Sequence, residues 1–194
     1  GVEAGIERIL VAGGDGTASE VVTGILTAGR GAQVEVGLLP FGTGADLVRG
    51  LGLPRKVNDA VTPIRAGRTR RIDAGRLRYV DHDGNDSTSH FINSATLGVS
   101  GMVCSVVNDT TKMFGGTVSF LIGTVRALLR FQPAPVELTL DGERIYEGDL
   151  VLATANNGSY FGGGMHGTPG ACFDDGLLDV LVIPGLSKAE LLAK

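Results

Sequence analysis

The glycine-rich stretch near the start of the chain reads Leu10-Val11-Ala12-Gly13-Gly14-Asp15-Gly16-Thr17-Ala18-Ser19-Glu20. An aliphatic run leads into it, and apolar residues at helical spacing follow it, at Val21, Val22, Ile25 and Leu26. The pattern predicts a strand, a tight turn and a helix, for which Thr17 is a suitable N-cap. Such a turn can bind phosphate, because glycines let the backbone approach the anion and the first N–H groups of the helix point at it.

Asp15 limits the ways in which this turn can bind phosphate. The turn contains no lysine, so it is not a Walker P-loop. A carboxylate repels neighbouring phosphates unless a cation lies between them, so we expect Mg²⁺ as the bridge. Folding should survive the loss of this carboxylate, because a loop carboxylate in a glycine turn contributes little packing. The alternative for the glycines alone is a tight strand-to-helix turn with an exposed aspartate.

A second stretch repeats the arrangement. The strand-like run 34–39 is followed by Pro40-Phe41-Gly42-Thr43-Gly44-Ala45-Asp46 and by a short helical segment that Gly52 and Pro54 close. Two consecutive strand–helix turns, each with a glycine, a threonine and an aspartate, would open on the same edge of a parallel sheet. Open α/β sheets bind their ligands at that edge. The pair therefore favours a ligand site over two structural turns.

The pattern of predicted secondary structure changes near residue 68. Before it, strands and helices alternate, and the last helix is expected over 58–66 although it contains Pro63. After it we expect strands over 70–79, 87–97, 134–140, 143–154 and 177–183, and helices over 99–109 and 117–131. Asp141-Gly142 predicts a hairpin turn. The expected organisation is a partial α/β domain over 1–68 with a parallel sheet, followed by a β-rich domain over 69–194.

Composition sets broad limits on the class of protein. Of the 194 residues 43% are hydrophobic, which is enough for a core. No run approaches the length of a membrane span, and no signal peptide is evident. Cys104 and Cys172 lie far apart, which favours a reduced cytoplasmic setting. The three histidines lack the spacing of a zinc site.

Positive charge is concentrated in one segment. Residues 49–78 contain nine basic residues and two acids, a charge of +7, although the whole chain carries −4. Such a segment can attract an anionic membrane surface. Nucleic acid is a weaker interpretation, because no aromatic residues interleave with the basic ones. A solvated surface with local salt bridges is the remaining alternative.

These motifs together resemble the diacylglycerol kinase catalytic family, which includes bacterial lipid kinases and, more distantly, the sphingosine and ceramide kinases. Beyond the two turns, the resemblance continues in order through Leu-Gly-Leu-Pro, Ile72-Asp73, Phe91-Ile92-Asn93, Ala155-Asn156-Asn157, Gly162-Gly163-Gly164, Pro169-Gly170-Ala171 and Asp174-Asp175-Gly176-Leu177-Leu178-Asp179. It covers essentially the whole chain. It implies an α/β part like that of NAD kinase and diacylglycerol kinase, a β-sandwich-like second domain and an active site in the cleft between them.

The resemblance also implies an activity and its residues. The activity is an ATP- and Mg²⁺-dependent transfer of the γ-phosphoryl group to the hydroxyl of diacylglycerol or a related lipid. Asp15 and Asp46 would organise Mg²⁺ through water, and a second, structural Mg²⁺ would be held by the Asp175 carboxylate and the carbonyls of Cys172 and Leu177. The ATP-binding residues would be Gly13, Gly14, Asp15, Gly16, Thr17, Ala18, Ser19, Glu20, Gly42 and Thr43.

The chain departs from the family in several places. The family usually has Asn at the position of Ala45 and often at that of Ser19, and Ala45 removes a polar side chain near the nucleotide. Members begin with a strand and an Asn-Pro-x-x-Gly-type loop, and they end with an Asp-Gly-Glu-type motif that supplies the catalytic base. Asp141-Gly142-Glu143 lies upstream of Gly162 rather than downstream, so we interpret it as a hairpin. The chain is therefore expected to be a fragment truncated at both ends, with the base beyond Lys194.

Two other functions stay open. NAD kinase shares Gly-Gly-Asp-Gly-Thr, but its later Asn-Glu-type motif is not evident here. A non-catalytic nucleotide- or membrane-binding fragment is the second alternative. For the lipid kinase we expect a cytoplasmic protein in peripheral contact with anionic membrane, no nucleic-acid partner, and a homodimer as one option for its assembly.

Overall fold

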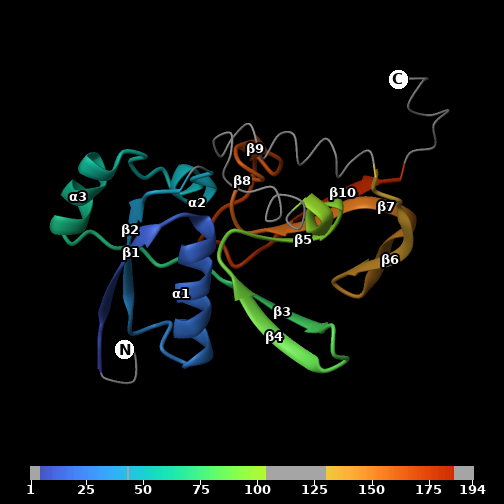
Figure 1. The fold of residues 1–194 in the computed structure, drawn as a ribbon, viewed down its shortest axis with the longest axis horizontal. Helices are drawn as coiled ribbons and strands as arrows, with labels where there is room; N and C mark the ends of the chain where they lie inside the picture. Colours follow the sequence, from blue (N-terminus) through green and yellow to red (C-terminus); the bar gives the residue numbers. More distant parts are fainter. Residues whose placement is uncertain (1–4, 43, 104–129, 186–194) are drawn as a thin grey trace. The chain divides into compact units, whose positions relative to one another are not determined.

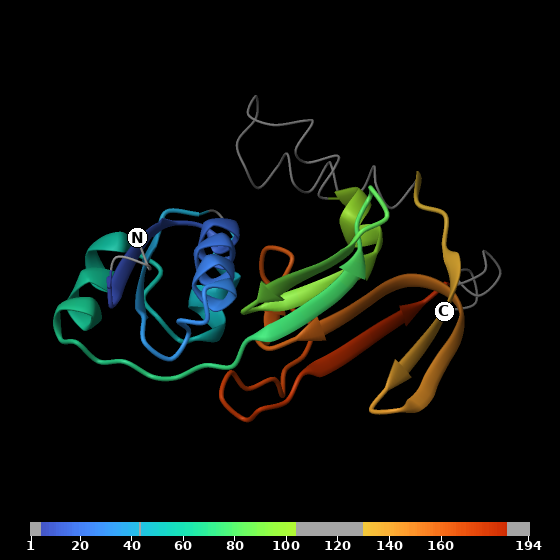
Figure 2. The ribbon, with the colours of Figure 1, turned by 90° about the horizontal axis from the view of Figure 1, so that it is seen from below.

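The computed structural model describes residues 5–42, 44–103 and 130–185. The chain forms two compact units, one of Gly1–Ala95 with Asn156–Asp179 and one of Thr96–Ala155 with Val180–Lys194. An N-terminal α/β part with parallel strands is followed by a mostly β part, so the expected fold class is confirmed (Figures 1 and 2). The domain boundary expected near residue 68 stays a prediction.

The α/β part begins with β1 (Arg8–Gly13), α1 (Asp15–Thr27) and β2 (Glu35–Pro40). The two strands are parallel, and their register runs from Arg8 opposite Glu35 to Gly13 opposite Pro40. Because both strands end at the same level, the turns that follow them lie side by side, as the sequence predicts. The helices α2 (Asp46–Gly50) and α3 (Val57–Arg65) come next. Figure 1 shows α1 and α3 on opposite sides of the two strands.

Two helix boundaries differ from expectation. Thr17 is not the N-cap of α1, because the helix begins at Asp15 and Gly14 is its N-cap. Gly14 has extended backbone, with φ −98° and ψ −171°, and its carbonyl accepts the Ala18 N–H at 3.0 Å. Thr17 therefore lies inside the first turn. The helix α3 continues through Pro63 and runs one residue earlier than expected at both ends.

The β-rich part begins with a hairpin of β3 (Gly75–Val80) and β4 (Asp86–Phe91). A separate sheet has the order β10-β7-β5, with β6 paired to β7. Its strands are β5 (Ser94–Gly98), β6 (Ala134–Leu140), β7 (Glu143–Asn156) and β10 (Asp179–Pro184). The hairpin turn predicted at Asp141-Gly142 is confirmed, and both residues have left-handed φ, 51° and 88°.

Several predicted elements are corrected in detail. The strand expected over 70–79 starts only at Gly75, and the one expected over 87–97 is interrupted after Phe91. At the interruption Ile92 is buried, and the Asn93 carbonyl accepts the N–H groups of two residues in another segment, Asn157 and Gly158. The short strands β8 (Tyr160–Phe161) and β9 (Met165–His166) were not predicted.

The expected helices of the second half are only partly described. The helix expected over 99–109 starts at residue 99, as the described residues 99–103 show. Nearly all of the helix expected over 117–131 lies outside the described residues. Within the described ranges, none of the helices has the length and apolar character needed to cross a bilayer.

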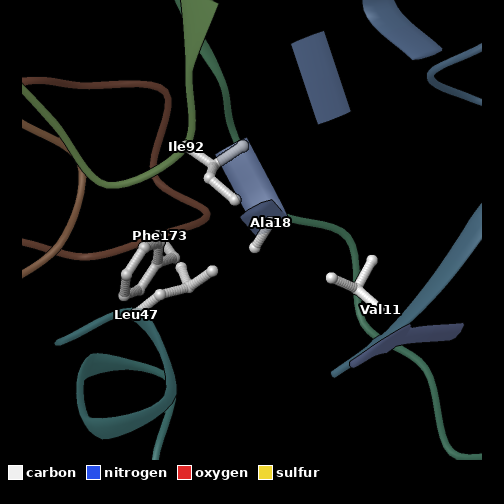
Figure 3. Close-up of a cluster of buried hydrophobic side chains, with 5 residues drawn as sticks. All are labelled: Val11, Ala18, Leu47, Ile92 and Phe173. Carbon is white, nitrogen blue, oxygen red and sulfur yellow. The ribbon is translucent and has the colours of Figure 1, made fainter. Parts of the chain in front are cut away.

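One apolar cluster holds the first unit together. It consists of Val11 from β1, Ala18 from α1, Leu47 from α2, Ile92 after β4, and Phe173 (Figure 3). Leu47 and Phe173 are each only 2% exposed. Burying one such large side chain stabilises the fold by about 1.5–3 kcal/mol. The cluster therefore fixes α2 and the loop around Phe173 against the α/β part.

The turns after β1 and β2 touch backbone to backbone. A Cβ added to Gly42 would lie 2.4 Å from the Gly14 Cα atom, closer than real Cβ atoms come. The Phe41 N–H donates to the Gly13 carbonyl at 3.1 Å and fixes the same approach. Glycine at position 42 is thus required by packing, whatever the turns bind, and a Cβ on Gly14 would also lie close, 3.1 Å from the Gly42 Cα atom.

We therefore expect Gly42→Ala to lower the free energy of unfolding by about 1–3 kcal/mol, because the added methyl group pushes the turns apart. Gly24→Ala is the matched control. Gly24 lies in α1 with nothing within 4 Å of an added Cβ, so alanine should raise stability by roughly 0.5–1 kcal/mol. Urea unfolding measures both. Equal effects of the two substitutions would contradict the steric explanation.

Candidate functional site

The N-terminus of α1 offers backbone donors at the edge of the sheet. No side chain caps this end in the described structure, because its N-cap is glycine. The N–H groups of Asp15, Gly16 and Thr17 have no partner within the helix, whereas that of Ala18 donates to Gly14. The helix dipole adds partial positive charge at the same place. An anion such as phosphate is the natural complement to this end.

Asp15 joins the two turns. Its Oδ2 accepts the Asp46 N–H at 3.0 Å, and its Oδ1 accepts the Leu47 N–H at 3.1 Å. The carboxylate thus caps α2, although it lies 31 residues earlier in the sequence. Sequence reasoning did not predict this contribution to stability, which arises because two backbone donors of α2 depend on Asp15.

Ala45, the residue before α2, has left-handed backbone with φ 53° and ψ 34°. This conformation costs an ordinary L-residue about 1–2 kcal/mol, and only Gly, Asn and Asp adopt it readily. An Asn at this position, which the resemblance implies as usual for the family, would therefore fit the left-handed backbone as well as supply a polar side chain. The chain carries local strain where that Asn is replaced by alanine.

Asp46 is buried at the start of α2, with 4% of its surface exposed. Its Oδ2 accepts the Gly163 N–H at 2.6 Å, and its Oδ1 pairs with the Arg49 guanidinium at 3.2 Å. Burial raises the pKa of this carboxyl and the neighbouring Asp15 charge adds to the rise, while the Gly163 N–H and Arg49 oppose it. Because the folded-state pKa is raised, the stability contributed by Asp46 falls as pH rises from its ordinary pKa through the raised one.

Arg49 lies between Asp46 and a short aromatic stack. Its guanidinium carbon is 5.3 Å from the centre of the Tyr160 ring, and that ring stacks on His166 at 4.4 Å. A Cβ on Gly164 would lie 2.5 Å from the arginine Nη1. Gly164 also has φ 117°, a conformation that L side chains rarely adopt, so both the lack of space for a Cβ and the backbone conformation require glycine there. Sequence reasoning placed Arg49 only in the basic segment 49–78 and did not predict this stack, because Tyr160 and His166 come from short strands that it did not predict.

The loop from Cys172 to Leu177 is held by carboxylates. Asp175 Oδ1 accepts the Leu177 N–H at 3.0 Å, and Asp174 Oδ1 accepts the Cys172 thiol at 3.1 Å. Asp73, a residue that sequence reasoning gave no role, accepts the Gly176 N–H at 2.7 Å. The hydrogen bond with Asp174 raises the pKa of the Cys172 thiol, which keeps it protonated.

The oxygen atoms of this loop are suitable ligands for a hard cation. Carboxylate and carbonyl oxygens are what Mg²⁺ and Ca²⁺ prefer, whereas soft metals need a thiolate. Among the described residues no three His, Cys, Asp or Glu side chains come together as a metal cluster. A metal here would therefore depend on main-chain carbonyls, as the resemblance implies for Cys172 and Leu177.

The predicted ATP-binding residues fall into two groups. Gly13, Gly14, Asp15 and Gly42 line a hollow of about 10 Å³ between the turns, room for one water at most. A nucleotide would therefore lie across the outer surface of the turns. Gly16, Thr17 and Glu20 are exposed on the first turns of α1, Ser19 is half-buried, and the Ala18 side chain belongs to the core. Thr43 lies outside the described residues.

Known proteins match both parts of the chain. The family model of the diacylglycerol kinase catalytic domain matches residues 2–77, and that of the YegS C-terminal NAD kinase beta sandwich-like domain matches residues 93–194. The "Probable lipid kinase YegS-like" of Chromohalobacter salexigens is 35% identical over 93% of this chain and 55% of its own length. A "Diacylglycerol kinase" of Mycobacterium tuberculosis is 34% identical over 98% of this chain and 59% of its own length.

Solved structures agree. A diacylglycerol kinase from Bacillus anthracis superposes with a TM-score of 0.64 at 28% identity, over 92% of this chain and 54% of that one. The chain therefore belongs to the family that the two family models describe, with the YegS-type C-terminal domain matching just over half of it and the diacylglycerol kinase catalytic domain matching its N-terminal part. It spans between half and two thirds of the length of these relatives.

The hydrogen bonds of Asp15 lead to a stability prediction. Asp15→Ala leaves two backbone donors of α2 without their acceptor, so the free energy of unfolding should fall by about 1–2 kcal/mol. Glu20→Ala removes an exposed carboxylate from the same helix and should stay within about 0.5 kcal/mol of the wild type. Thermal and urea unfolding compare the two. An unchanged Asp15→Ala protein would show that the cap does not stabilise α2.

Proposed function

We propose that the protein carrying this chain is an ATP- and Mg²⁺-dependent lipid kinase, which transfers the γ-phosphoryl group of ATP to the hydroxyl of diacylglycerol or a related lipid. The uncapped N-terminus of α1, beside a second glycine turn at the same sheet edge, is the observation that carries the proposal. The lipid-kinase relatives support the choice of acceptor.

The chain's own residues would mainly position the nucleotide. Gly13, Gly14, Gly16 and Thr17 would hold the phosphates with backbone N–H groups, and Glu20 and Thr43 would help to fix the rest of ATP. In the reaction the lipid hydroxyl oxygen bonds to the γ-phosphorus, the bond to the β–γ bridging oxygen breaks, and ADP leaves. Such transfers depend on positioning and charge neutralisation. A general base takes the hydroxyl proton.

Asp15 fits a Mg²⁺ ion at the phosphates better than Asp46 does. Asp15 is half-buried, and each of its oxygens has used one hydrogen bond, so both keep a lone pair for a metal-bound water. Asp46 is buried, with its oxygens held by Arg49 and Gly163. Bound Mg²⁺ would neutralise the charge on the transferred phosphate. We therefore assign Asp15 the outer contact with the ion and Asp46 the support behind it.

Gly16 provides a test that separates ligand binding from folding. An added Cβ at Gly16 would meet nothing within 4 Å, and the residue lies in the first turn of α1. Gly16→Ala should therefore leave stability unchanged or slightly raised, yet weaken ADP binding by roughly tenfold, because the methyl group blocks close approach of the phosphate. Titration calorimetry with Mg-ADP and urea unfolding provide the two readouts. Full ADP affinity in this variant would place the phosphates elsewhere.

The acceptor is tested by turnover. The protein carrying this chain should move label from γ-labelled ATP to diacylglycerol in mixed micelles and should leave NAD unlabelled. Label on NAD alone would support the NAD kinase alternative. Label on neither acceptor, in a protein that binds ADP, would support a non-catalytic nucleotide-binding function.

The second metal is tested by stability. We propose that the Asp175 carboxylate and the carbonyls of Cys172 and Leu177 hold a structural Mg²⁺. Free metal at a hundred times its dissociation constant raises stability by about 2.7 kcal/mol. The wild type should thus melt higher with Mg²⁺ than with chelator, and Asp175→Asn should abolish most of the difference. Asp174→Asn is the matched control, because the Asp174 carboxylate accepts a hydrogen bond from the Cys172 thiol and is not one of the proposed metal ligands. The opposite ranking of these variants would overturn the assignment.

A further inference from the structure

The structure sorts the basic residues of the segment 49–78 into three groups. Arg49 is paired with buried Asp46 and lies over Tyr160. Arg76 and Arg78 belong to β3. The remaining six flank α3 or end it, and all are exposed; we call them the α3 basic surface: Arg55, Lys56, Arg65, Arg68, Arg70 and Arg71. Asp59 is the single acid between residues 55 and 71, so this stretch carries +5.

These six cations are not neutralised by neighbours in the part of the chain that the structure describes. The salt bridges found there are Arg8–Glu35, Asp46–Arg49 and Arg144–Glu147. Within the α3 basic surface, the Arg70 guanidinium lies over an aromatic ring, 5.9 Å from the centre of Phe173. Local salt bridges therefore do not neutralise these exposed side chains. Exposed charges of one sign, concentrated in one stretch of chain and without ion-pair partners, attract a partner of the opposite sign.

We propose that the α3 basic surface docks the protein on a membrane that contains anionic lipids. The inference rests on the proposed function, because a kinase whose acceptor is a lipid has to meet that acceptor at a bilayer. Two exposed apolar side chains lie in the same stretch, Leu53 at 37% and Val61 at 39%, and can enter the headgroup layer. The stretch 53–71 contains no aromatic residue for stacking on bases, which disfavours nucleic acid.

Charge reversal on this surface provides the test. Each cation near an anionic bilayer strengthens binding by roughly fivefold. Arg55→Glu with Arg68→Glu should therefore weaken binding to phosphatidylcholine–phosphatidylserine vesicles at least about 25-fold at low salt. Both residues lie outside α3, so the helix keeps its capping and its basic last turn. Arg76→Glu with Arg78→Glu makes the same charge change on β3 and should weaken binding much less. Circular dichroism and melting curves verify that both variants fold.

Flotation of the vesicles, without nucleotide, reads the result independently of the kinase reaction. Wild-type protein should float with anionic vesicles, stay behind with neutral ones, and be released by high salt. Equal losses in the two double variants would assign the attraction to overall charge and overturn the proposal. Binding to neutral vesicles, or tighter binding to duplex DNA than to anionic vesicles, would overturn it as well. Normal docking with no lipid phosphorylation would instead refute the proposed function alone.

Discussion

The close contact between Gly14 and Gly42 is the constraint on which the candidate site depends. Two turns without side chains approach until their backbones touch, so the ends of β1 and β2 become one continuous edge. At the same contact, Gly14 has extended backbone and is the N-cap of α1, whose first N–H groups no side chain caps in the described structure. The contact also brings the Asp15 carboxylate to the first residues of α2. A bulkier residue at either position would separate all of these features together.

The glycines of the two motifs therefore serve different purposes. Gly14 and Gly42 are needed by each other, and an added Cβ on Gly13 would lie 2.7 Å from the Thr17 Cβ. Gly16 has open space around it, so only a ligand could require its lack of a side chain. A run that looks uniform in the sequence thus divides into residues that shape the turn and a residue that faces outward. The division follows from three-dimensional neighbours and not from spacing.

Much of the fold could be predicted from local patterns. The aliphatic run before Gly13 and the helical spacing after it predict β1 and α1, and Asp141-Gly142 predicts the hairpin between β6 and β7. The capping role of Asp15 could not be predicted, because its partners lie 31 and 32 residues away. The prediction that Thr17 is the N-cap of α1 was wrong, because the helix begins at Asp15 and Gly14 is its N-cap. The strands β8 and β9 have two residues each, too few for any periodicity to appear.

A helix of five residues such as α2 has almost no stability of its own, so its contacts keep it folded. One end is held by Asp15, and the first side chain, Asp46, holds the glycine loop through Gly163. The backbone strain at Ala45 works against this arrangement. Thermodynamic linkage follows, because a ligand that moved the Asp15 carboxylate away from the Asp46 and Leu47 N–H groups would release the start of α2. The glycine turn at the start of α1 and the loop around Gly163 are thus coupled through a short helix that depends on its contacts.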